Sequence, residues 1–320
     1  MTVERKFKKE AKANSIVTPR TIGRVIGMHG QRVELHTDKG IIKAEIRGKV
    51  KYGETNESPI AVGDYVVFSL NGPHPATVDR ILERKSSVTR PAIDKKDYTQ
   101  VLVSNVDRLV IVTSVDEPPF SPGLVDRFLV IAFKANIHPV IVLNKIDLRD
   151  PSSFELYFDA WRKLSCETVC TSAKVGEGLD ELIPILRIGT SMIAGHSGVG
   201  KSSLVNRINP ELQLKTGEIS KYSGKGVHTT ASVTMYQLFP DGWVVDTPGL
   251  KDLGLVGVDK RNLYKYFPEF SQFEADCQFS NCIHVDEPSC GIKDALSRND
   301  PGIAEFRYKS YLKLFSLLTK

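Results

Sequence analysis

One glycine-rich loop constrains this chain more than any other feature. It reads Gly195-His196-Ser197-Gly198-Val199-Gly200-Lys201-Ser202 and continues into Ser203, which matches G-x-x-x-x-G-K-[ST]. An apolar run precedes the loop and a helical pattern follows it, the context that this motif requires. Glycines let backbone N–H groups turn inward around phosphate oxygens, and the helix adds its positive N-terminal end. The loop therefore predicts nucleotide phosphate binding, with Lys201 reaching the β- and γ-phosphates and Ser202 ligating Mg²⁺.

The residues around this loop alternate between apolar strands and helical patterns. Strands are predicted at 109–113, 139–143, 168–172, 191–195, 232–239 and 243–246, and helices at 152–164, 178–187 and 201–209. A further helix is expected where Val125, Phe128, Leu129, Ala132 and Phe133 recur at helical spacing. Such alternation predicts an α/β domain with a mostly parallel sheet and helices on both faces.

Two short motifs follow neighbouring strands and bear on the choice of base. Asn144-Lys145-Ile146-Asp147 comes directly after the strand 139–143, and Thr171-Ser172-Ala173-Lys174 ends the next one. Ligands of parallel sheets bind at this edge. A carboxylate such as Asp147 accepts from both N1–H and the 2-amino group of guanine, whereas adenine presents an acceptor there. The pattern therefore favours GTP over ATP, with a backbone N–H of the second motif available to the guanine O6.

The remaining motifs look like the switches of GTPases, in an unusual order. Asp246-Thr247-Pro248-Gly249 matches D-x-x-G, which reaches Mg²⁺ through water and senses the γ-phosphate, and Gly226-Val227-His228-Thr229-Thr230 looks like a first switch. Thr230 is the preferred Mg²⁺ ligand because the next strand begins just after it. Ordinary GTPases place the phosphate loop first, but here the base motifs precede it. The sequence therefore resembles the circularly permuted GTPases.

The residue after D-x-x-G, which in Ras-like enzymes is a glutamine that orients water, is Leu250 here. Leucine neither donates nor accepts a hydrogen bond, so slow intrinsic hydrolysis is expected. His228 is the candidate for orienting the water; the alternative is a solvated loop histidine. The candidate catalytic residues are His228, Thr230, Lys201 and Asp246.

A cluster of soft ligands lies near the C-terminus. Cys277, Cys282, His284 and Cys290 give C-x4-C-x-H-x5-C, the composition of a Cys₃His structural zinc site. The alternative is a set of buried thiols with a surface histidine. Cys166 and Cys170 have no histidine nearby and are expected to be core thiols. The chain has only five cysteines, and the number is odd, which favours a reduced, cytoplasmic protein over a disulfide scaffold.

The N-terminal part of the chain is basic. Residues 1–20 carry six Lys or Arg against two acidic residues, and residues 21–90 carry eleven against eight. Short alternating strands between Thr21 and Arg90, including 62–70, predict a closed β-barrel with an OB-fold as the first choice. Positive charge on such a barrel favours a nucleic-acid partner. A solvated lysine tail that aids solubility is the alternative.

Together these motifs closely resemble the RsgA (YjeQ) family, the permuted GTPases that depend on the small ribosomal subunit. The resemblance implies a basic arm (1–20), an OB-fold RNA-binding domain (21–92), a permuted GTPase domain (93–252) and a zinc-binding helical domain (253–320) that ends in a helix over about 301–319. The nucleotide-binding positions are Asn144, Lys145, Ile146, Asp147, Ser172, Ala173, Lys174, Gly195, His196, Ser197, Gly198, Val199, Gly200, Lys201, Ser202, Ser203, Thr229, Thr230, Asp246 and Gly249. Leu250 and His228 agree with the family; Val227 stands where a basic residue is expected.

The resemblance also implies a function. Such a GTPase binds the immature small ribosomal subunit, is stimulated by it, and hydrolyses GTP to GDP and phosphate as a late assembly checkpoint that drives release. We expect ribosomal RNA as partner, one structural Zn²⁺, Mg²⁺ with GTP, and a monomer. The alternative is a GTP-gated adaptor that docks a non-ribosomal protein. No apolar run reaches the roughly 20 residues of a membrane helix, so no membrane partner is expected.

Overall fold

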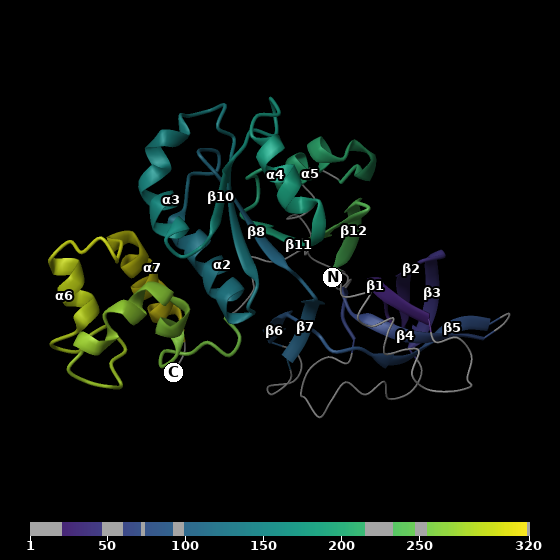
Figure 1. Ribbon diagram of the computed structural model, residues 1–320, viewed down its shortest axis with the longest axis horizontal. Coiled ribbons are helices and arrows are strands. Elements are labelled where there is room, and N and C mark those ends of the chain that lie inside the picture. The colour runs from purple at the N-terminus through teal and green to yellow at the C-terminus, as the bar shows by residue number, and fades with distance from the viewer. Residues whose placement is uncertain are drawn as a thin grey trace, which may run out of the picture.

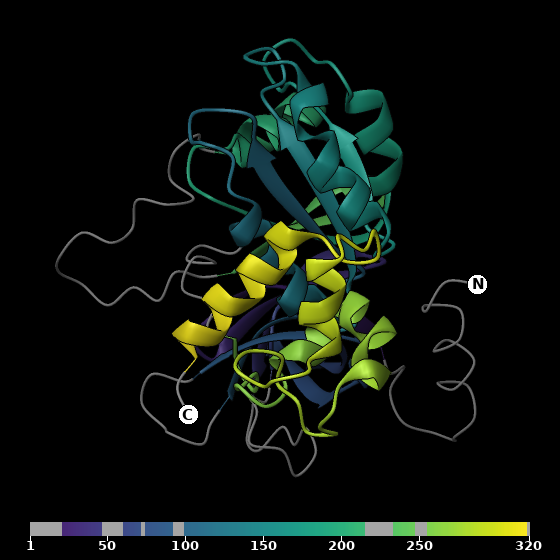
Figure 2. The same ribbon diagram turned by 90° about the vertical axis from the view of Figure 1, so that its left-hand side faces the viewer.

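The computed structural model describes residues 21–46, 60–71, 74–91, 99–214, 233–246 and 255–318. These residues form a barrel of short strands, a six-stranded sheet flanked by helices, and a C-terminal group of short helices. The barrel and the C-terminal group lie at opposite ends of the molecule, with the sheet domain between them (Figure 1). In Figure 2 the C-terminal helices face the viewer.

Five strands close the barrel, as the alternating pattern predicted. They are β1 Thr21–His29, β2 Arg32–Thr37, β3 Gly40–Ile46, β4 Tyr65–Asn71 and β5 His74–Ile81. Their order is β1-β2-β3-β5-β4, and β4 pairs back onto β1. Strands β3 and β5 run parallel, and the other neighbours are antiparallel. Val25, Leu35 and Phe68 are fully buried inside, so the inward face of each strand supplies the barrel core.

The predicted starting residue of one barrel strand is wrong. The apolar pattern over 62–70 predicted a continuous strand, but β4 begins at Tyr65. Gly63 has φ +94°, a left-handed conformation that favours glycine, and a Cβ there would lie 2.0 Å from the Ser104 carbonyl oxygen. The buried Asp64 carboxylate accepts a 2.6 Å hydrogen bond from the Ser104 hydroxyl. This close packing against Ser104 replaces the start of the predicted strand with a turn.

Two further strands join the barrel to the sheet domain. β6 Ser87–Pro91 and β7 Thr99–Ser104 pair antiparallel as a separate two-stranded sheet, and the sequence pattern predicted neither. The pair spans residue 92, where the sequence suggested a domain boundary. Val88 and Val103 are 2% and 0% exposed and belong to the same apolar cluster as the helices on one face of the main sheet. The two described strands are therefore packed against the sheet domain.

The main sheet has six strands, of which five run parallel. They are β8 Arg108–Ser114, β9 His138–Asn144, β10 Glu167–Cys170, β11 Ile188–Gly195, β12 Thr234–Phe239 and β13 Asp241–Asp246. The order is β10-β9-β8-β11-β13-β12, with β12 antiparallel to β13. Residues 139–144 are all buried, as expected of a central strand covered on both faces.

Four α-helices cover the two faces, as predicted. They are α2 Pro122–Lys134, α3 Glu155–Arg162, α4 Leu179–Leu186 and α5 Lys201–Ile208. Residues of α2 and α3 pack in one apolar cluster, and residues of α4 and α5 pack in another on the opposite face. The predicted helix 152–164 was too long, because Pro151–Phe154 is a 3₁₀ turn before α3. A second 3₁₀ turn, Pro210–Leu212, follows α5.

The two cysteines of the sheet domain match the expectation of core thiols. Cys166 is 5% exposed, and burial raises its pKa to about 12. Cys170 is half-buried in β10 and packs against the same apolar cluster.

The C-terminal region is built from short helices around an aromatic core. It contains the 3₁₀ helices Leu263–Tyr266, Pro268–Gln272 and Glu274–Asp276, then α6 Gly291–Ser297 and α7 Glu305–Leu317. Phe267, Phe270 and Tyr311 are fully buried, with ring centroids 5.0–5.4 Å apart. The final helix begins at Glu305, later than the predicted 301, because the Asp300 carboxylate accepts from the Gly302 N–H and holds a turn there.

A buried ion network fastens this region to the sheet domain. Arg307 of α7 is 1% exposed and donates to Asp126 of α2 and to Glu269, each at 2.7 Å. The indole of Trp161 also donates to Asp126, at 2.9 Å. Burial raises the pKa of Asp126, and the positive charge of Arg307 opposes that shift. One guanidinium therefore links α7 and the residue 268–272 helix to α2.

Replacing Arg307 with methionine is expected to destabilise the protein by about 3 kcal/mol, because two buried carboxylates lose their cation. Urea unfolding measures the change. The matched control is Lys309→Met, which removes an exposed pair with Glu305 on the same helix and should cost below about 1 kcal/mol. Equal small effects of both variants would contradict a structural role for the network.

Candidate nucleotide-binding site and metal centre

The phosphate loop lies between β11 and α5, as the motif required. Gly195, Gly198 and Gly200 have φ of +144°, +84° and +96°, which favour glycine. A Cβ on Gly195 would lie 2.1 Å from the Val112 carbonyl oxygen, and one on Gly200 would lie 2.2 Å from the Asn144 amide nitrogen. The glycines therefore allow both the turn and its close approach to the ends of β8 and β9.

The cationic and oxygen-bearing side chains of the phosphate site lie together at the start of α5. The Lys201 ammonium donates to the carbonyl oxygens of Gly195 and His196, at 3.0 and 2.7 Å. Ser202, in the first turn of α5, and Asp246, at the end of β13, line one small cavity with Lys201. Burial raises the pKa of Asp246, and the charge of Lys201 opposes the shift. A hydroxyl and a carboxylate facing one cavity fit the oxygen ligands that Mg²⁺ prefers.

The Asn144 side chain is hydrogen-bonded within the protein and connects three loops. It is 1% exposed, and its amide nitrogen donates to the Val199 carbonyl of the phosphate loop at 2.8 Å. Its amide oxygen accepts from the Ala173 N–H at 3.1 Å and from the Thr171 hydroxyl at 3.2 Å. This one side chain therefore sets the position of the phosphate loop relative to both base motifs.

Asp147 is held as an ionised acceptor at the same edge of the sheet. The Ser172 hydroxyl donates to one carboxylate oxygen at 2.6 Å, and the Lys174 ammonium lies 3.7 Å from the other. The Ser172 hydrogen bond, with help from Lys174, lowers the pKa of Asp147 below its usual range. A carboxylate at neutral pH can accept two hydrogen bonds from one base edge, which suits guanine.

Lys145 and Ile146 complete the first base motif. Lys145 has φ +66°, and its ammonium donates to the Glu117 carbonyl oxygen. The Ile146 N–H donates to the Thr171 carbonyl at 3.2 Å, which ties the two base motifs together through the backbone.

The structure thus gathers most of the residues that the sequence singled out. The phosphate loop, both base motifs and Asp246 meet at the carboxyl edge of the parallel sheet. His228, Thr229, Thr230, Gly249 and Leu250 lie outside the described residues. Sequence analysis gave no role to the Thr171 side chain. Its contact with Asn144 has no local signature, because 27 positions separate the partners.

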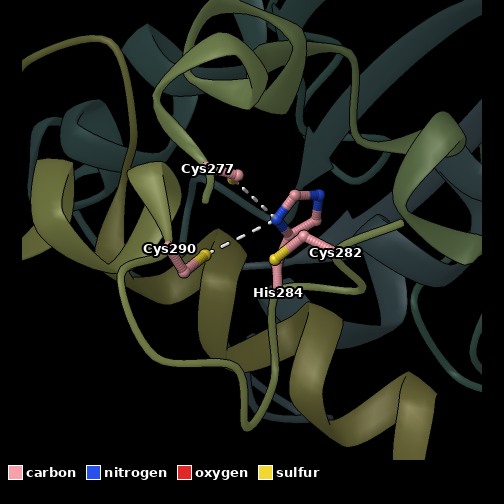
Figure 3. A group of neighbouring side chains, drawn as sticks. All are labelled: Cys277, Cys282, His284 and Cys290. Carbon is pink, nitrogen blue, oxygen red and sulfur yellow. Dashed lines mark hydrogen bonds between the residues drawn. The ribbon is translucent and has the colours of Figure 1, made fainter. Parts of the chain in front are cut away.

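The four predicted zinc ligands meet in space. Their ligand atoms all lie within 4.8 Å of one another (Figure 3). Nδ1 of His284 is 3.7 Å from Sγ of Cys277 and 3.5 Å from Sγ of Cys290. Tetrahedral Zn²⁺ with Zn–S of about 2.3 Å and Zn–N of about 2.0 Å separates sulfur from nitrogen by about 3.5 Å. The cluster therefore fits one structural Zn²⁺.

The ring of His284 is oriented for such a role. The backbone of His284 has φ +61°, and its carbonyl oxygen accepts a hydrogen bond from the Tyr308 hydroxyl at 2.9 Å. The ring nitrogen Nε2 is buried and has no hydrogen-bond partner among the described residues. The ring packs edge-on against Tyr264 and Phe270. Nδ1 is therefore the nitrogen that faces the three sulfurs, and Nε2 faces aromatic surface.

The loop that carries the ligands is braced by polar contacts. The Glu287 carboxylate accepts from the backbone N–H groups of Ile283 and Val285, at 2.8 and 3.0 Å. The Gly291 N–H donates to Sγ of Cys277. Burial raises the pKa of the Cys282 thiol. Glu287 and Tyr308 belong to no motif, so the sequence alone does not indicate their roles.

Among the described residues, no helix combines the length and apolar character needed to cross a lipid bilayer.

Comparison with known proteins places this geometry in context. Residues 81–256 match the family model described as RsgA GTPase. The small ribosomal subunit biogenesis GTPase RsgA of Christiangramia forsetii is 37% identical over 284 residues, covering 87% of this chain and 90% of that protein. The protein of the same name from Chlorobaculum tepidum is 40% identical over 269 residues, covering 82% and 86%.

Two solved structures are similar over almost the whole chain. YjeQ from Thermotoga maritima is 35% identical, with a TM-score of 0.72 and coverage of 93% of this chain and 98% of that one. YloQ, described as a circularly permuted GTPase, is 27% identical, with a TM-score of 0.70 and coverage of 93% and 94%. The permuted order of motifs inferred from the sequence is therefore confirmed.

Proposed function

The chain belongs to the RsgA GTPase family, and we propose that it acts on the immature small ribosomal subunit as a late assembly checkpoint. In this proposal it binds the subunit in the cytoplasm as a monomer, and hydrolysis of GTP to GDP and phosphate drives its release. The observation that carries the nucleotide chemistry is the Asn144 side chain, which joins the phosphate loop to both base motifs.

Each part of the nucleotide is assigned to described residues. The loop 195–203 would cradle the phosphates, and Lys201 would leave its loop carbonyls to meet the β- and γ-phosphates. Ser202 and Asp246 would hold Mg²⁺, directly and through water. When bound, that ion offsets charge on the β- and γ-phosphates. Asp147 would accept from the guanine edge, with Ser172 and Lys174 fixing its orientation.

Water activation is assigned to the first switch. Thr230 would complete the Mg²⁺ ligands, and His228 would orient the attacking water when the subunit is bound. That is a positioning effect, which requires the histidine only at the moment of reaction. We therefore expect slow turnover of the free protein, because Leu250 offers no hydrogen bond.

The RNA-facing parts would be the arm at 1–20 and the barrel domain at 21–92, which hold the basic excess of the chain. The permuted GTPase domain at 93–252 would lie between them and the zinc-binding domain at 253–320. A GTP-gated adaptor for a non-ribosomal protein is the second candidate. Nothing in the described residues favours it over RNA, whereas the basic N-terminal excess favours the first.

Cosedimentation with small ribosomal subunits tests the checkpoint. Binding should be tight with a non-hydrolysable GTP analogue, at least tenfold weaker with GDP, and steeply dependent on salt, because Lys and Arg release counterions from RNA phosphates. Deleting residues 1–19 should reduce the salt slope. Equal retention with both nucleotides would remove the release step, and a salt-independent affinity would favour the adaptor.

A further inference from the structure

A cavity outside the nucleotide site lies where three parts of the molecule meet. It has a volume of 460 Å³ and is bounded by residues 84–89 before and within β6, residues 130–135 at the C-terminal end of α2, and residues 255–258 of the C-terminal region. Figure 1 shows β6 beneath the C-terminal end of α2, on the side of the barrel. This volume lies in the range of about 300–1,000 Å³ that is typical of small-molecule sites.

The charge of the cavity wall has one sign. Among the described lining residues there are three basic side chains and no acidic one. Arg84 is occupied by the buried Asp64 carboxylate, 2.7 Å away. Lys85 is exposed and has no carboxylate partner among the described residues. The Lys134 ammonium donates to the Val256 carbonyl, and it too has no described carboxylate partner. Two ammonium groups therefore face the cavity with uncompensated charge.

The rest of the wall combines apolar surface with hydroxyls. Ile131 of α2 and Val256 present aliphatic side chains, and Ser87 and Thr89 of β6 present hydroxyl groups. An inorganic anion would leave the aliphatic wall uncovered, and a purely apolar ligand would leave two ammonium groups desolvated. A ligand that fits must therefore combine a partly apolar body, polar edges and an anionic group.

We propose that this cavity is a second binding site, for a nucleoside phosphate whose base packs on Ile131 and Val256 and whose phosphate meets Lys85 and Lys134. Ser87 and Thr89 would pair with the base or ribose edge. The ligand is either a free nucleotide or one unstacked nucleotide of an RNA, since both present the same chemistry. The site shares no residue with the phosphate loop or the base motifs.

Binding to the full-length protein tests the proposal. The protein is first loaded with one equivalent of GDP and Mg²⁺, and it is then titrated with adenosine monophosphate, which the guanine site disfavours. In a second arm, a five-nucleotide RNA containing 4-thiouridine is crosslinked to the protein, and the modified peptides are identified. The variants are Lys85→Glu, Lys85→Arg and the matched control Lys265→Glu, an exposed lysine that does not line the cavity.

We expect Lys85→Glu to weaken binding by about tenfold or more. Lys85→Arg keeps the positive charge and should retain most of the binding, and Lys265→Glu should leave it unchanged. Saturable binding of the mononucleotide supports a free nucleotide, and crosslinks within 84–89 or 130–135 from the RNA alone support an RNA nucleotide. The proposal is overturned if neither probe binds, if crosslinks fall elsewhere, or if Lys85→Glu and Lys265→Glu behave alike. GDP retention measured in the same samples separates this outcome from loss of the guanine site.

Discussion

Replacing Cys282 with serine is expected to release the zinc and unfold residues 277–290, while the affinity for GTP stays near that of the unchanged protein. The substitution removes one of four ligands from a cluster whose atoms lie within 4.8 Å of one another. Structural zinc contributes about 10–16 kcal/mol to small folded units, so the loop has no comparable support without it. The nucleotide site is spared because none of its described residues contacts the cluster.

Zinc content by elemental analysis, proteolysis of the C-terminal region, and GTP titration measure the three quantities together. Cys170→Ser is the matched control, since this thiol lies in β10 away from the cluster and should leave zinc content unchanged. Purified unchanged protein without one zinc per chain would contradict the assignment. So would a Cys282→Ser protein that keeps both its zinc and its resistance to protease.

Replacing Asp147 with asparagine is expected to lower the affinity for GTP by about 10²–10³-fold, because two charge-assisted hydrogen bonds to guanine are lost. Xanthine carries an oxygen where guanine carries its 2-amino group, and the new amide can donate to that oxygen. The variant should therefore gain relative affinity for XTP. Competition among GTP, ATP and XTP measures the change in preference.

Asp150→Asn is the matched control for this substitution. Asp150 accepts from the Ser152 N–H at the start of a 3₁₀ turn, and asparagine can accept the same bond. Its nucleotide preference should not change. If Asp147→Asn lost affinity for GTP, ATP and XTP equally, the carboxylate would support the fold of the loop rather than read the base.

Much of this site was predictable because its determinants are local in the sequence. The phosphate loop needs glycines at fixed spacing before a lysine at a helix start, and the structure has α5 beginning at Lys201. The strands of the sheet were recognisable because their residues are apolar on both faces, as in 139–143. The Cys₃His cluster was recognisable because its ligands fall within fourteen positions of the chain.

The remaining features depend on contacts between distant residues. Arg307 reads as one more surface cation in an amphipathic helix, and only the fold brings it to Asp126, 181 positions away. The turn at Gly63 looked like a strand because its neighbours are apolar, and packing against Ser104 decided otherwise. The sequence pattern did not predict the β6–β7 pair, because its strands are short and lie where the barrel joins the sheet domain.

The steady-state rate of GTP hydrolysis, measured with and without purified small ribosomal subunits, decides whether this protein is a subunit-stimulated GTPase. We expect slow turnover of the free protein and stimulation of about tenfold or more by subunits, because the proposal has His228 reach the water only in the complex with the subunit. His228→Ala should keep its affinity for GTP and for the subunit but lose most of the stimulated rate. If subunits left the rate of the unmodified protein unchanged, the protein would not be a subunit-stimulated GTPase.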